Sequence, residues 1–141
     1  MCLEGRPDRI PHALRVYRGK FLDAYVSAKA AQRGYIVAIW RGRHVNDLTE
    51  LSTRELTGYW SEIALVSTAV QHHYQPRKVN YEVLGNQRPH LHTHITARFA
   101  AGDVAPGQPL PLRRDLDLPP DLVDADVAAL TKLLANDGRP S

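Results

Sequence analysis

Alternation of apolar and polar positions predicts most of the strands in this chain. Five segments have the apolar content or the period of two expected of strands: residues 14–17, 21–26, 34–40, 77–84 and 89–96. The third is the most apolar, so we expect it at the centre of a sheet. The fourth alternates Val79, Tyr81 and Val83 with polar Asn80 and Glu82, and a turn at residues 85–88 joins it antiparallel to the fifth.

Apolar residues recur every three or four positions between residues 52 and 74, which predicts one long amphipathic helix. Ser52 and Glu55 have the spacing of a capping box that begins a helix, and Pro76 prevents its continuation. A short helical turn is expected just before it, at residues 47–51. A second helix is expected from Asp121 to Asn136, and it would be ended by Gly138 and Pro140: its apolar residues are Leu122, Val123, Val127, Leu130, Leu133 and Leu134.

The order of these elements predicts an α+β fold, in which a five-stranded antiparallel sheet carries one long helix. At 141 residues the chain is long enough for a single domain with one core. We place that core at about residues 14–100. Residues 1–13 are expected to be a loose lead-in, and residues 101–141 a segment rich in proline and glycine followed by the carboxyl-terminal helix.

Composition and charge indicate which cellular location and which binding partners to expect. No run of about eighteen apolar residues is present and the first residues lack a signal peptide's apolar region, so we expect a cytoplasmic protein that does not enter a membrane. The net charge of +3 divides into +6 for residues 1–43, 0 for residues 44–100 and −3 for residues 101–141. The basic part has no clustered runs and no interleaved aromatics, so we expect scattered, solvated arginines and no nucleic-acid partner, although the charge would suit a small polyanionic substrate.

Three histidines spaced two apart, His90, His92 and His94, are the main candidate for chemistry. On a strand they would share one face, open to solvent, with about 6.6 Å between neighbours. Three interpretations remain open. In the first, the strand is simply histidine-rich and has an exposed polar face. In the second, two of the histidines chelate Zn²⁺, although the outer pair is far apart and no clear carboxylate or cysteine completes the coordination shell. In the third interpretation a neutral imidazole attacks phosphorus, flanked by two others.

Residues 80–89, Asn-Tyr-Glu-Val-Leu-Gly-Asn-Gln-Arg-Pro, followed by His-x-His-x-His, resemble the signature of the histidine-triad (HIT) family of nucleotide hydrolases and transferases. The resemblance extends from about Leu14 to Arg98 and implies a HIT-like fold and an enzyme. In such enzymes the middle histidine, here His92, attacks the α-phosphate of a phosphoramidate, an adenylate or a dinucleoside polyphosphate and forms a nucleotidyl-histidine. His90 and His94 would bind phosphate oxygens and assist the leaving group, and no metal or other cofactor is required. The alternative is a non-catalytic binding protein for nucleotides or sugar phosphates.

The resemblance also implies four substrate-binding positions, Asn80, Asn86, Ser27 and Tyr35. Asn80 and Asn86 match amides that contact ribose or phosphate. Ser27 stands where relatives usually have an acid or amide for the ribose hydroxyls, and Tyr35 where most have a fourth histidine.

The resemblance assigns a structural role to His44, which follows the central strand. HIT proteins commonly form homodimers, so we expect a homodimer here. Its interface would use the long helix and the central strand, through Trp40, Tyr59 or Trp60.

Overall fold

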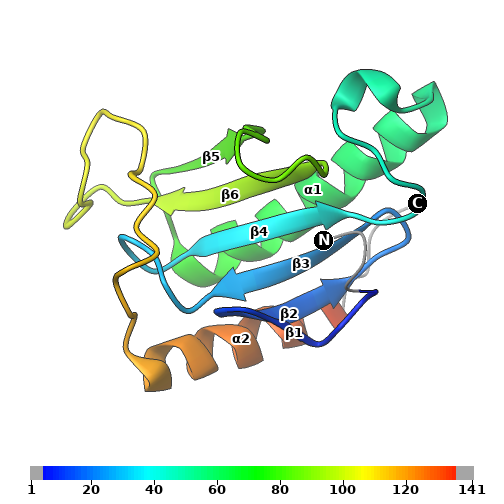
Figure 1. The fold of residues 1–141 in the computed structure, drawn as a ribbon. Helices are drawn as coiled ribbons and strands as arrows, with labels where there is room; N and C mark the ends of the chain where they lie inside the picture. The colour runs from blue at the N-terminus through cyan, green and yellow to red at the C-terminus, as the bar shows by residue number, and fades with distance from the viewer. Residues whose placement is uncertain (1–4, 136–141) are drawn as a thin grey trace.

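The computed structural model describes residues 5–135 and shows an antiparallel sheet with two helices (Figure 1). The six strands lie in the order β1-β2-β3-β4-β6-β5. Their bounds are Arg9–Ile10 for β1, Ala13–Arg18 for β2, Leu22–Ser27 for β3, Tyr35–Trp40 for β4, Lys78–Glu82 for β5 and His92–Arg98 for β6. The α+β class is confirmed, and β4 lies inside the sheet as expected. The expected count of five strands was one short, because part of the predicted lead-in pairs with β2 as β1.

The long helix α1 (Thr53–Tyr74) begins and ends where the sequence predicted. The Ser52 hydroxyl accepts from the backbone N–H of Glu55, and the Glu55 carboxylate accepts from the N–H of Ser52, so the capping box is confirmed. Gln75 follows in the left-handed conformation, with φ of 51°, and ends the helix. The expected helical turn is the 3₁₀ helix η2 (Leu48–Glu50).

Helix α2 (Pro120–Ala135) starts one residue earlier than predicted, at a proline, which is well tolerated in the first turn. Its predicted end at Asn136, and the residues Gly138 and Pro140 expected to stop it, lie outside the described residues. Of the helices within residues 5–135, none is both long enough and apolar enough to cross a membrane.

Both helices cover the same face of the sheet. Along β4, Ile36, Ala38 and Trp40 belong to the main core together with residues of α1, and Leu130 and Leu134 of α2 complete that core. In Figure 1, α1 lies behind the sheet and α2 runs along the β2 side of it. The opposite face, which carries Val37 and Ile39, has no helix on it, and it is the face on which polar side chains gather.

The proposed dimer contacts need correction, because two of the three aromatic residues are part of the core of the monomer. Trp40 is 2% exposed and Tyr59 is 0% exposed. The Tyr59 hydroxyl is within hydrogen-bond distance of Thr93 Oγ1, at 2.6 Å. Trp60 is the one of the three that stays partly exposed.

Two arginines expected to be solvated are instead tied to a buried carboxylate on the helix-free face. Asp23 of β3 is completely buried, and it accepts from Arg41 Nε at 2.9 Å and from Arg6 Nε at 3.0 Å. Tyr25 adds a hydroxyl that receives a bond from Arg41 Nη2. Within the predicted lead-in, the described residues 5–13 are therefore held against the sheet rather than loose.

Candidate active site

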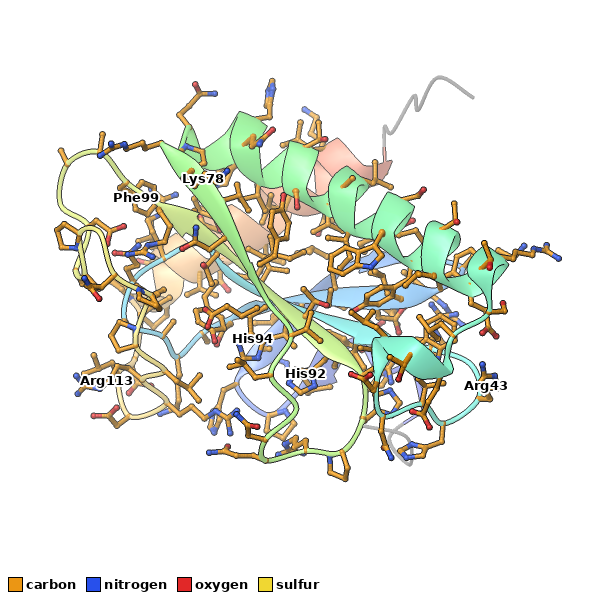
Figure 2. The ribbon with its side chains drawn as sticks, turned by 90° about the horizontal axis from the view of Figure 1, so that it is seen from above. Arg43, Lys78, His92, His94, Phe99 and Arg113 are labelled. Carbon is orange, nitrogen blue, oxygen red and sulfur yellow. The ribbon has the colours of Figure 1, made fainter. Side chains whose placement is uncertain are left out.

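His92 and His94 lie side by side on β6, on the face without helices. Because side chains alternate along a strand, residues 92 and 94 share this face, while Thr93 and Ile95 point to the core side. Figure 2 shows both labelled imidazoles on the side of the sheet away from α1. Their ring centres are 5.2 Å apart, and both rings line a cavity of about 150 Å³.

The expectation of three exposed imidazoles in a row is wrong in two respects. His90, His92 and His94 are only 5%, 7% and 6% exposed. Strand β6 begins at His92, so His90 precedes it and is not part of the cavity wall. The His90 ring instead places Nε2 2.8 Å from the Trp40 carbonyl oxygen and packs beside His44, with ring centres 5.6 Å apart. Burial also contradicts the interpretation of the segment as an exposed polar face.

The tautomer of His92 follows from a hydrogen bond to the backbone. Its Nδ1 lies 2.7 Å from the His90 carbonyl oxygen, and a carbonyl can only accept, so Nδ1 carries the proton. In the neutral ring the lone pair then belongs to Nε2. Burial lowers the pKa of His92, and the positive charges of Arg114 and Arg88 lower it further, so the ring is neutral near pH 7. His92 is thus held as a neutral imidazole with one defined nucleophilic atom.

His94 has a side-chain partner in Tyr35. The Tyr35 hydroxyl lies 2.6 Å from His94 Nδ1, and the two ring centres are 5.3 Å apart, with the ring planes tilted by 55°. Burial is the main cause that lowers the pKa of His94 to about 4 and raises that of Tyr35 to about 12. Both groups are therefore neutral at ordinary pH. Tyr35 orients the neighbouring imidazole, and it does not exchange protons near neutrality.

The remaining predicted substrate residues are not all brought to the triad cavity. Ser27 lines it, but its hydroxyl donates to the Lys29 carbonyl at 2.7 Å and so is occupied within its own turn. Asn86 is exposed in the connection between β5 and β6 and does not line the cavity. Asn80 lines a second cavity of about 580 Å³, where its Oδ1 accepts from Arg98 Nη1 at 2.8 Å.

Comparison with known proteins identifies the family of this fold. The model of the HIT domain matches residues 11–101. The chain belongs to the HIT family. The matched segment contains β2 to β6 and α1, and with them every predicted site residue. It ends before the proline- and glycine-containing segment that leads to α2.

Individual HIT relatives support the fold. A histidine triad protein from Bradyrhizobium japonicum superposes with a TM-score of 0.79 at 23% identity, covering 88% of this chain and 92% of that one. One from Sinorhizobium meliloti gives 0.75 at 16% identity, covering 86% and 90%. A bis(5'-adenosyl)-triphosphatase of Saccharomyces cerevisiae is 26% identical over 93 residues, which are 62% of this chain and 45% of that protein. The chain thus aligns with less than half the length of that curated relative.

Reasoning from the sequence missed four cavity residues with basic side chains: His12, Lys29, Arg88 and Arg114. Arg114 lies beyond the segment matched by the HIT model. It reaches the site because residues 116–118 pair with residues 28–30 through backbone bonds from Leu118 N–H to Ala28 O at 2.9 Å and from Ala30 N–H to Leu116 O at 3.1 Å. No local sequence pattern around these residues predicts that backbone pairing.

The interpretation of the triad as a metal site can be compared with the side chains that the structure describes. Within residues 5–135, no group of three histidine, cysteine, aspartate or glutamate side chains is placed to hold an ion. Contrary to expectation, a carboxylate does lie close by, since Glu82 pairs with His94 across the β5–β6 ladder. Nδ1 of His92 is committed to a carbonyl oxygen, and so is Nε2 of His90.

Proposed function

We propose that this HIT protein is a nucleotide hydrolase or nucleotidyl transferase that acts at an α-phosphate through a covalent intermediate on His92. The observation that carries the proposal is the bond from His92 Nδ1–H to the His90 carbonyl, which leaves Nε2 as the lone-pair nitrogen of a neutral ring beside a cavity. A buried, neutral and oriented imidazole is what nucleophilic catalysis on phosphorus requires.

In the first step, Nε2 of His92 attacks the α-phosphorus while the bond from phosphorus to the leaving group breaks and its electron pair goes to the leaving atom. The ring becomes a nucleotidyl-imidazolium, whose positive charge is stabilised by the His90 carbonyl that accepts from Nδ1–H. In the second step water, or phosphate in a transferase, attacks the same phosphorus and the P–N electron pair returns to the ring. The attacking water loses one proton to solvent or to the leaving group, so His92 regains its starting state.

His90 and His94 take different parts in this proposal. The His90 ring is fixed to the Trp40 carbonyl, and its own carbonyl sets the tautomer of His92, so His90 is a positioning residue. His94 lines the cavity next to His92 and is held through Nδ1 by Tyr35, which leaves Nε2 to contact a phosphate oxygen or the leaving group. In this proposal His94 contacts the substrate and His90 does not.

A binding protein for nucleotides or sugar phosphates is the second candidate. It is favoured by Ser27, whose hydroxyl is occupied within its own turn, and by Tyr35, which carries no proton chemistry near neutrality. Such a protein would use the same cavity and would form no covalent bond with its ligand.

Trapping the intermediate separates the two candidates. The protein is mixed with a nucleoside 5'-phosphoramidate or with bis(5'-adenosyl) triphosphate, quenched in alkali to preserve the labile P–N bond, digested and analysed by mass spectrometry. We expect a nucleotidyl group on the peptide that contains His92, at early times only. Binding of these compounds without turnover and without an adduct would favour the binding protein.

The pH dependence of turnover is a second consequence. The nucleophile must be neutral, and burial holds the pKa of His92 below its ordinary value of 6.5. Its lone pair is therefore present above that pKa and is lost as the pH falls through it. We expect kcat/KM to stay level from pH 8 to about 6.5 and to decrease only at lower pH. An acid limb that already begins between pH 8 and 7 would contradict the neutral, buried state of this ring.

A further inference from the structure

Within the described part of the chain, two arginines at the triad cavity differ from most others because they form no ion pair with a carboxylate. Arg6, Arg15, Arg33, Arg41, Arg43, Arg98 and Arg113 each form an ion pair with a carboxylate. Among residues 5–135, neither Arg88 nor Arg114 has such a partner, and both side chains are exposed where they line the cavity. Their positive charge is thus available to a ligand.

The lining of the cavity carries positive charge and no carboxylate. Besides Arg88 and Arg114 it includes Lys29, whose charge is offset by an ion pair with Asp117 at 2.7 Å. The Glu82 carboxylate, which pairs with His94 across the β5–β6 ladder, does not line the cavity, so the two arginines are the charged lining residues without an ion pair among residues 5–135. A cavity of this kind attracts an anion, and a guanidinium matches the paired oxygens of a phosphate group better than an ammonium does.

The two arginines reach the site from separate parts of the chain. Arg88 belongs to the connection between β5 and β6, shortly before His92. Arg114 belongs to the segment after the sheet, which the 116–118 pairing fixes against residues 28–30. Its neighbour Arg113 lies on the side of the sheet that His92 and His94 face, as Figure 2 shows. The field of Arg114 acts on His92, His94 and Tyr35, and that of Arg88 acts on His92.

We propose that Arg88 and Arg114 form a subsite for the phosphates beyond the α-phosphate, so that the enzyme selects substrates whose leaving group is itself a phosphate chain. The inference rests on the proposed function for its kinetic consequence. When the bond from the α-phosphorus to the bridging oxygen breaks, negative charge grows on the leaving phosphate, and the two guanidinium groups stabilise it there. An amine leaving group carries no phosphate and gains nothing from them.

Binding of inorganic tripolyphosphate tests the subsite without any turnover. Its affinity is measured by calorimetry at low salt for the natural chain, for Arg88→Ala, Arg114→Ala and the double variant, and for Arg113→Ala. Arg113 is the matched control, because it is adjacent, exposed and paired with Asp115, and it does not line the cavity. We expect each subsite variant to bind about tenfold more weakly, with Arg113→Ala unchanged and the affinity of the natural chain falling with added salt. Equal affinity in the natural chain and the double variant, or no binding by the natural chain, overturns the inference.

Substrate preference tests its role in catalysis. The ratio of kcat/KM for bis(5'-adenosyl) triphosphate to kcat/KM for adenosine 5'-phosphoramidate is expected to decrease about tenfold in Arg114→Ala and to recover partly in Arg114→Lys. An equal loss on both substrates overturns the inference and leaves the proposed function standing. If the natural chain turns over neither substrate, the proposed function fails, and tripolyphosphate binding still decides whether the subsite exists.

Discussion

Replacing His92 with asparagine is expected to reduce kcat on a nucleoside phosphoramidate by about four orders of magnitude or more, the size of loss seen when a covalent nucleophile is removed. The asparagine amide nitrogen can still donate to the His90 carbonyl, as His92 Nδ1 does at 2.7 Å. It offers no lone pair for attack on phosphorus, because amide resonance delocalises it. The change therefore removes the chemistry and keeps the local hydrogen bond.

The measurement is single-turnover kinetics, with thermal unfolding followed in parallel to show that the variant is folded. His72→Asn is the matched control: this histidine is exposed in the last turn of α1 and does not line the triad cavity, so its variant should keep full activity. A His92→Asn protein that retains a tenth of the natural rate would exclude His92 as the nucleophile. Loss of activity together with loss of the fold is answered by His92→Gln, which keeps an amide in a longer side chain.

Replacing Asp23 with alanine is expected to lower the free energy of unfolding by about 3–5 kcal/mol, the range for removing one partner of a buried ion pair. Asp23 is 0% exposed and Arg41 is 7% exposed. The variant takes away the carboxylate that accepts from Arg41 Nε at 2.9 Å. The Arg41 guanidinium, on the residue that directly follows β4, stays buried. It also releases Arg6, and with it a contact that holds the amino-terminal segment on the sheet.

Urea unfolding followed by circular dichroism measures the change, provided the transition stays two-state and its slope is unaltered. Asp115→Ala is the control, because the Arg113–Asp115 pair is exposed and solvent screens it, so the stability of that variant should match the natural chain. An Asp23→Ala protein within about 1 kcal/mol of the natural chain would show that water or a rearranged neighbour replaces the carboxylate.

Features of the site that depend on short stretches of sequence were predictable. The spacing of His92 and His94 places them on one face of a strand, because side chains alternate along any extended backbone. Helix α1 was predictable with its capping box, because the hydrogen bonds of a capping box join two residues that are three apart in sequence, here Ser52 and Glu55. The same reasoning failed for His90, since the strand begins two residues later and only pairing with β4 decides where a ladder starts.

The sequence by itself determined the order and type of the main elements, the pair of imidazoles on one strand face and the resemblance to the HIT family. The first two follow from periodicity, capping and spacing, and the resemblance is carried by the motif at residues 80–94; all of them involve neighbours along the chain. The tertiary structure decided that the triad is buried, that the His90 carbonyl accepts from His92 Nδ1, that Asn80 lies at another cavity and that Arg114 lines the same cavity as His92. Each of these depends on contacts between segments far apart in sequence. Their geometry exists only once the strands have paired and the helices have packed against the sheet.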